Sequence, residues 1–159
     1  MRLRLLAVGL LALMLGGASL ATAEEVTRDT YKAQVEPICK TNREANEKLL
    51  KGVKKEVRKG EYAIAGKKFG KAAVALKKAY VQLKAVPQPA ADQARLTKWL
   101  AYLKQEVSLF EAASKALKAE NKSKIQSLQV KIDHTANLAN STVLSFSFHY
   151  CKVETSKFS

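Results

Sequence analysis

Two cysteines and two histidines are the side chains of this sequence best suited to covalent or metal chemistry. Cys39 lies early in the chain and Cys151 lies near its end. Two cysteines in an exported chain pair as a disulfide, because oxidising surroundings permit it. We therefore predict a Cys39–Cys151 disulfide. The alternative is a reactive Cys151 thiol activated by the nearby His149, and it requires a reducing compartment.

The remaining chemistry-bearing residues form no recognisable catalytic or metal site. His134 follows Asp133, and His149 has only Cys151 at ligand spacing. The Glu-x-x-His pattern of di-metal bundles and the Cys-x-x-Cys-His pattern of covalent haem sites are missing. Phosphate loops, nucleophile elbows and zinc spacings are missing too. The sequence therefore predicts a protein that is not an enzyme and that has no cofactor and no metal.

Lysine is the residue type that gives the clearest indication of function. The chain carries 28 basic and 14 acidic residues. Eleven of the basic residues fall between Lys51 and Lys84, where only Glu56 and Glu61 oppose them. In an antiparallel bundle the turn near residue 60 and the turn near residue 121 share one end, so lysines of the second turn join this group. The candidate polyanion-binding residues, called the basic patch below, are Lys51, Lys54, Lys55, Arg58, Lys59, Lys67, Lys68, Lys71, Lys118, Lys122 and Lys124.

A concentrated positive surface attracts anionic envelope polymers, anionic lipid head groups or nucleic acid. Two details weigh against a specific site and favour a solvated surface. The residues are mostly lysine, whereas bidentate phosphate contacts use arginine, and few aromatic residues are interleaved for base stacking. Sequence-specific nucleic-acid binding is therefore not expected. The alternative is a module that binds a protein partner, in which the charge only confers solubility.

The first 23 residues predict a signal peptide, with cleavage after Ala23. Arg2 and Arg4 precede an apolar run that ends at Leu15, and Ala21-Thr22-Ala23 supplies small residues at the cleavage site. An uncleaved anchor is the alternative, but the apolar run is short for a bilayer. We therefore expect a secreted or extracytoplasmic protein whose mature domain is residues 24–159.

The mature part predicts an all-α fold, an antiparallel four-helix bundle with helices at about residues 27–59, 62–86, 91–119 and 123–146. Gly60 and the Pro87-Gln88-Pro89 segment separate the helices. Pro37 either kinks the first helix or starts it afresh. Ser123 and Gln126 resemble a capping box at the start of the last helix. The stripe expected to be buried on the first helix is Tyr31, Val35, Ile38, Asn42, Ala45, Leu49, Val53 and Val57.

The predicted disulfide constrains the end of the chain. A straight last helix, rising about 1.5 Å per residue, would carry Cys151 roughly 12 Å past the level of Cys39. We therefore expect the last helix to end near Ser145 and the tail to fold back, or the first helix to bend at Pro37.

Three features recur together and carry a resemblance to a known group of proteins. They are a cysteine within Ile38-Cys39-Lys40, a Pro-x-Pro hairpin at Pro87-Gln88-Pro89, and an Ala- and Asn-rich last helix that ends in an aromatic tail with Cys151. The pattern is similar to that of small secreted two-cysteine helical proteins of unknown function from actinobacteria. The resemblance covers nearly the whole mature chain, and it implies a fold without implying an activity.

Overall fold

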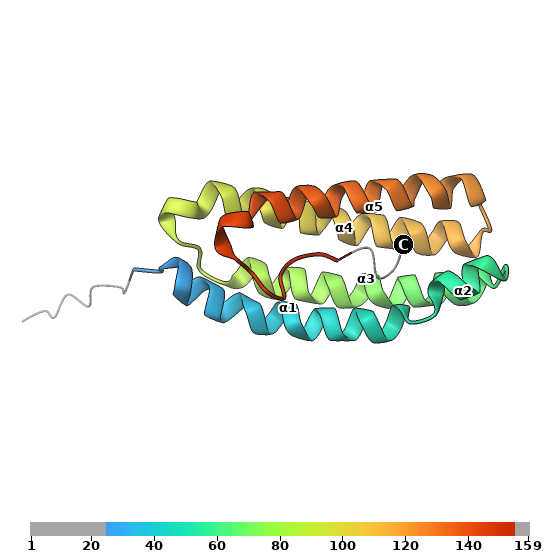
Figure 1. Cartoon of the computed structure of the whole chain (residues 1–159), viewed down its shortest axis with the longest axis horizontal. Coiled ribbons are helices and arrows are strands. Elements are labelled where there is room, and N and C mark those ends of the chain that lie inside the picture. The colour runs from blue at the N-terminus through green and yellow to red at the C-terminus, as the bar shows by residue number, and fades with distance from the viewer. Residues whose placement is uncertain (1–24, 155–159) are drawn as a thin grey trace, which may run out of the picture.

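The computed structural model describes residues 25–154, and these form an all-α bundle (Figure 1). Among them there is no β-strand. The helices are α1 (Arg28–Leu50), α2 (Val53–Arg58), α3 (Tyr62–Ala85), α4 (Gln93–Lys118) and α5 (Lys122–Thr142), with 3-10 turns η1 (Ala90–Asp92) and η2 (Leu144–Phe146). The predicted fold class is therefore confirmed. The predicted signal peptide lies outside the described residues.

Successive long helices run in opposite directions in Figure 1. The main packing pairs are α3 with α4, α4 with α5, and α1 with α3. The irregular residues 147–154, called the tail below, run back along the bundle between α5 and α1 (Figure 1). The tail thus occupies the side of the bundle between its first and last helices.

The predicted first helix is wrong at its end. It stops at Leu50, and a separate helix α2 starts at Val53. Gly52 lies between them with φ +83°, a left-handed conformation that glycine adopts without strain. Pro37, in contrast, does not restart the helix, because α1 continues through it.

The buried stripe of α1 also differs from the prediction beyond Val35. Its buried residues are Tyr31, Val35, Cys39, Asn46 and Leu50. The predicted residues Ile38, Asn42, Ala45 and Leu49 are only half-buried, and Cys39, Asn46 and Leu50 occupy the fully buried positions. The buried position taken by Asn46 is the least expected from its residue type.

The last helix begins and ends earlier than predicted. Asn121 caps α5 by accepting the Lys124 backbone N–H, so the predicted capping box at Ser123 is wrong. The helix ends at Thr142, and η2 follows. Ser147 then turns the chain with φ +49°. The tail therefore folds back, which is the first of the two predicted ways to bring Cys151 to Cys39.

Aromatic side chains fill the core where the tail returns to the bundle. Trp99 of α4 is fully buried, as its position on the helix predicts. Its ring lies 5.5 Å from that of Phe148, and the Phe148 ring lies 5.2 Å from that of Phe146. Phe146 in turn contacts Tyr31 of α1 edge to face. Phe146 of η2 and Phe148 of the tail thus complete the core around Trp99 and Tyr31.

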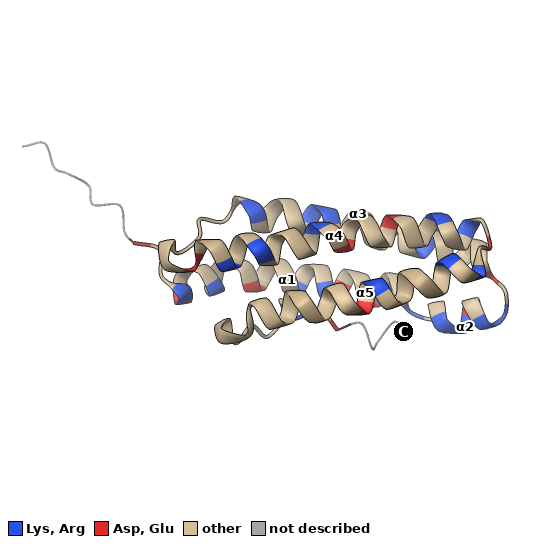
Figure 2. Cartoon of the chain, turned by 90° about the horizontal axis from the view of Figure 1, so that it is seen from above, with Lys and Arg blue, Asp and Glu red and all other residues tan. Residues whose placement is uncertain are grey.

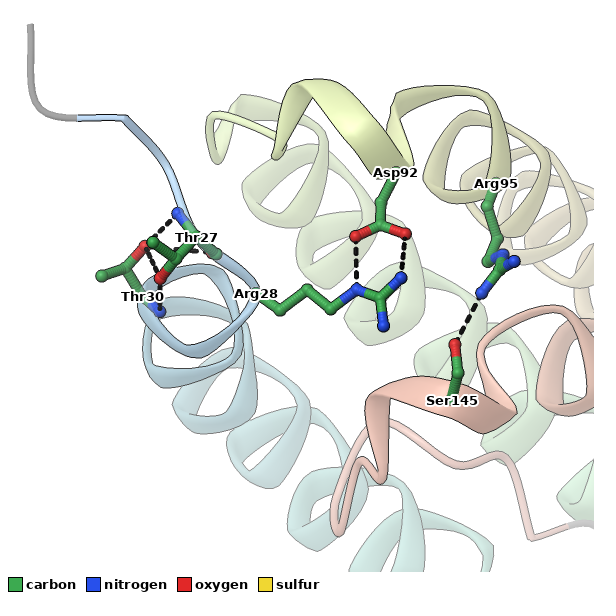
Figure 3. Close-up of polar contacts among 6 residues, drawn as sticks. All are labelled: Thr27, Arg28, Thr30, Asp92, Arg95 and Ser145. Carbon is green, nitrogen blue, oxygen red and sulfur yellow. Dashed lines mark hydrogen bonds and ion pairs between the residues drawn. The ribbon is translucent and has the colours of Figure 1, made fainter.

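The start of α1 is fixed by two sets of hydrogen bonds (Figure 3). Thr27 and Thr30 form a reciprocal capping box, with backbone N–H groups donating to the partner hydroxyls at 3.0 and 3.2 Å. Arg28 donates from Nε and Nη2 to the two carboxylate oxygens of Asp92, at 2.5 and 2.7 Å. Because Asp92 ends η1, this bidentate pair joins α1 to the loop before α4.

Replacing Asp92 by asparagine should destabilise the protein at neutral pH. The Arg28 guanidinium lowers the pKa of Asp92 below its ordinary value of 3.8, because it hydrogen-bonds the carboxylate. Stability from a lowered pKa is present above the unfolded value and is lost as the pH falls through the folded value. We therefore expect Asp92→Asn to lower the melting temperature at pH 7, with a difference that narrows below pH 3.8. Melting curves from pH 2.5 to 7 would measure it, and a difference independent of pH would contradict this account.

Candidate functional site

The basic patch lies where two turns of the bundle meet. The α2–α3 and α4–α5 connections share one end of the molecule (Figure 1). Ser114 Oγ of α4 donates to the Gly66 carbonyl of α3 at 2.7 Å. A Cβ built on Gly66 would come within 2.8 Å of the Lys118 side chain, so only glycine lets the two helices approach this closely. This contact holds the lysines of both turns on one surface.

Ribbon segments coloured blue for lysine and arginine are frequent at this end in Figure 2, and few red acidic segments lie among them. Segments 51–71 and 115–124 together hold twelve basic residues and three acidic ones. Ten of the eleven predicted patch residues are exposed, and the eleventh, Lys68, is half-buried. The bundle therefore brings the predicted residues together at one end and leaves nearly all of them open to solvent.

Lys68 has a structural role within the patch. Its ammonium forms an ion pair with Glu56 of α2 and donates to the Lys51 carbonyl at 2.7 Å. The Lys51 carbonyl belongs to the residue that ends α1. Lys68 therefore satisfies a carbonyl at the end of one helix and holds α2 against α3. Its charge is partly neutralised within the protein.

The outer face of α3 combines lysines with large apolar side chains. Ile64, Val74 and Val81 are 49%, 70% and 59% exposed, which is high for residues of this type. Helical spacing places them on one face together with lysines. In chain order this stripe, called the α3 stripe below, is Ile64, Lys67, Lys71, Val74, Lys78 and Val81. A stripe of this kind offers both charge and apolar contact to a partner surface.

The predicted disulfide joins α1 to the tail. Cys39 and Cys151 are bonded, with their Cα atoms 4.9 Å apart. Neither cysteine is a free thiol. The alternative of a thiol activated by His149 is therefore wrong, and the exposed His149 ring contacts Tyr150 instead.

Polar side chains of α1 hold the tail on both sides of the disulfide. The two carboxylate oxygens of Glu36 accept the backbone N–H groups of His149 and Tyr150, at 2.5 and 2.8 Å. Arg43 donates to the carbonyls of His149 and Lys152, at 3.2 and 2.8 Å. The tail is therefore docked along its length, and the disulfide is only one of its attachments.

Asn140 of α5 holds the opposite side of the tail. Its side-chain amide donates to the Val153 carbonyl at 2.9 Å and accepts the Val153 N–H at 2.8 Å. A single side chain thus satisfies both backbone groups of one tail residue. Together with Glu36 and Arg43, this contact makes the tail a bridge between the first and last long helices.

A cavity of about 90 Å³ lies beneath the tail, inside the bundle. Its lining is mostly apolar, and it includes the carboxyl group of Glu106 from α4. Glu106 is only 1% exposed, and its Oε1 atom has no hydrogen-bond partner. Glu106 was not among the predicted site residues. Its position three residues after Leu103 and four before Phe110, on the apolar stripe of α4, was the available indication.

No protein-family model, curated protein or solved structure matches this chain. Within residues 25–154, no group of three or more His, Cys, Asp and Glu side chains is placed to hold a metal ion. No helix in the same range is long and apolar enough to cross a membrane. Functional proposals for the chain therefore rest on its own geometry.

Proposed function

We propose that this protein is a non-enzymatic extracytoplasmic module that associates with anionic envelope polymers or lipids through its basic patch. The observation that carries the proposal is the convergence of two lysine-rich turns on one exposed end. The disulfide agrees with an oxidising compartment, and the signal peptide predicted for residues 1–23 accounts for export to it. The resemblance to secreted two-cysteine proteins supports the same location.

The α3 stripe favours an anionic lipid surface over a soluble polymer. Ile64 begins this stripe beside the patch lysine Lys67, and Val74 follows the patch lysine Lys71. Apolar side chains gain free energy when they enter the head-group region, while lysines on the same face interact with anionic lipids. A soluble polyanion offers only the second of these interactions.

The alternative function is a protein-binding module in which the lysines confer solubility. The exposed apolar residues of the α3 stripe are the feature that favours it. The two functions differ in their dependence on salt, because electrostatic binding weakens as ions screen the charges. Apolar contacts with a protein partner persist at the same salt concentrations.

Removing four patch lysines should weaken binding to anionic vesicles. The variant carries Lys55→Gln, Lys67→Gln, Lys71→Gln and Lys122→Gln, and it keeps Lys68 because that residue is structural. Each lysine near an anionic membrane contributes about 1 kcal/mol, so we expect at least about tenfold weaker binding. Co-sedimentation with vesicles of phosphatidylglycerol and phosphatidylcholine, across a salt series, measures the effect.

A matched control removes the same charge elsewhere. Lys84, Lys98, Lys104 and Lys131 are exposed and lie outside both the basic patch and the α3 stripe. Their replacement by glutamine should weaken binding much less. Equal losses in the two variants would show that net charge alone drives association, and no binding to anionic vesicles at low salt would overturn the lipid proposal.

The α3 stripe can be tested in the same assay. Changing Ile64, Val74 and Val81 to serine removes apolar contact and leaves every charge in place. Vesicle binding should then fall, while binding to heparin, a soluble polyanion, should stay unchanged. An equal effect on both ligands would indicate damage to the fold.

A further inference from the structure

The cavity beneath the tail is lined by every long helix of the bundle and by the tail itself. Its apolar walls include Phe69 of α3, Phe110 of α4 and Ile132 of α5. Asn46 of α1 and Val153 of the tail line its other sides. This arrangement fits a ligand site, because protein ligand pockets are mainly apolar concavities with a few convergent polar groups.

Two oxygen atoms of the lining lack hydrogen-bond donors. Glu106 Oε1 and Asn46 Oδ1 are both buried and unpartnered. The Asn46 amide nitrogen already donates to Asn42 Oδ1 at 2.9 Å. Buried polar atoms without partners cost free energy. The indole Nε1–H of the lining residue Trp99 is also buried and unpartnered. The cavity therefore offers two unpartnered acceptors and one unpartnered donor.

The protein does not supply a cation to Glu106. Arg43 also lines the cavity, but its guanidinium donates to the tail carbonyls and lies 3.4 Å from the Glu154 carboxylate. Gln129 of α5 donates its amide N–H to Asp133. The donor groups of Arg43 and Gln129 are thus directed away from Glu106.

We propose that this cavity binds a short-chain aliphatic amine, with its ammonium group donating to Glu106 and Asn46 and its alkyl chain packed among the apolar walls. An ammonium group carries three N–H donors and no acceptor, which matches two acceptors in one cavity. The volume of about 90 Å³ is smaller than the cavity of about 150 Å³ that accommodates benzene. A short alkyl chain therefore fits better than a ring. The site is independent of the basic patch.

Binding of the amine would release one proton. Burial raises the pKa of Glu106 to about 8, so its carboxyl group is mostly neutral at pH 7. A protonated amine pairs with the carboxylate form, and the carboxyl proton then leaves to solvent. The affinity should therefore rise about tenfold for each pH unit from 6 towards 8. An amine such as n-butylamine stays protonated across this range.

Other titratable groups line the cavity or lie next to it, and their ionisation also affects how amine affinity changes with pH. The α1 and tail groups lie at the mouth, and Asp133 of α5 accepts from the lining residue Gln129. Glu106 is the only carboxyl among the lining residues that is fully buried. The other titratable lining residues are Arg43, Glu47, Tyr80, Tyr150, Lys152 and Glu154.

Isothermal titration calorimetry of the disulfide-bonded protein with n-butylamine tests the proposal. Titrations at pH 6, 7 and 8, in buffers of different ionisation heat, give both the affinity and the number of protons released. n-Butanol and butyrate serve as matched ligands without an ammonium group. We expect the amine to bind at least tenfold more tightly than either, with about one proton released at pH 7.

Two variants on α4 assign the effect to one side chain. Glu106→Gln keeps the shape but cannot form a carboxylate, so it should lose at least tenfold in amine affinity and release no proton. Glu111→Gln, an exposed position on the same helix, should bind as the original protein does. Equal binding of amine and alcohol, or undiminished binding by Glu106→Gln, would overturn the proposal. Absence of any amine binding at millimolar concentration, as for a cavity that holds only water, would overturn it too.

Discussion

Replacing Cys39 and Cys151 together by serine should lower the free energy of unfolding by about 5 kcal/mol. The two residues are separated by 112 positions, and cross-linking so long a loop restricts the unfolded chain strongly in the chain-entropy model. A loss of this size corresponds to a fall of roughly 15–20 °C in melting temperature for a domain of this length. Thermal and urea unfolding followed by circular dichroism would measure it.

The single tryptophan is a probe that distinguishes loss of the disulfide from release of the tail. Trp99 is fully buried and its ring packs against Phe148 of the tail. Because Glu36 and Arg43 also hold the tail, we expect the double serine variant to keep a buried tryptophan spectrum at 25 °C. The original protein, reduced with a thiol reagent, should match the variant. A stability loss below 1 kcal/mol would contradict the predicted role of the disulfide.

Glu106→Gln should stabilise the protein, increasingly so as the pH rises. Burial raises the pKa of Glu106 from its ordinary value of 4.5 to about 8. A carboxyl with a raised pKa holds its proton better in the folded state, so the original protein loses stability as the pH rises from 4.5 to 8. Each pH unit costs about 1.4 kcal/mol, so the variant should be more stable by on the order of 3 kcal/mol at pH 7.

Comparing the stability of the Glu106→Gln variant with that of the original protein at pH 4.5 and at pH 7 identifies the cause of the stabilisation. At pH 4.5 the carboxyl is protonated in the folded state and about half protonated in the unfolded state, so the variant and the original protein should unfold at similar urea concentrations. Glu111→Gln should show no such divergence, because Glu111 is exposed. A pH-independent stabilisation would point to packing or hydrogen bonding of the glutamine instead.

Local signals in the sequence were enough to predict the long helices and the disulfide. Prolines at 87 and 89 prevent a helix from continuing and the glycine at 60 disfavours it, and helices are interrupted at both places in the structure. The two cysteines could be paired because an exported chain offered no other partner for either.

The features that sequence reasoning missed depend on contacts between distant residues. The break at Gly52 accompanies the contact between Lys68 of α3 and the Lys51 carbonyl at the end of α1. The docking of the tail depends on Glu36, which looks like an ordinary surface residue of α1 in the sequence. Glu106 lay on an apolar stripe, but only the three-dimensional arrangement shows that no cation faces it.

The position of the tail on α1 also determines when the fold can be completed. The helices α3, α4 and α5 pack against their neighbours in the chain, so they can assemble through local contacts soon after synthesis. Tyr31 and Cys39 of α1, in contrast, meet partners from residues 146–151. The apolar residues in the first half of α1 are therefore fully covered only after nearly the last part of the domain has been synthesised, although α3 already packs against this helix. If the chain is exported, as we propose, its folding would finish after translocation, when Cys39 and Cys151 can be oxidised to the disulfide.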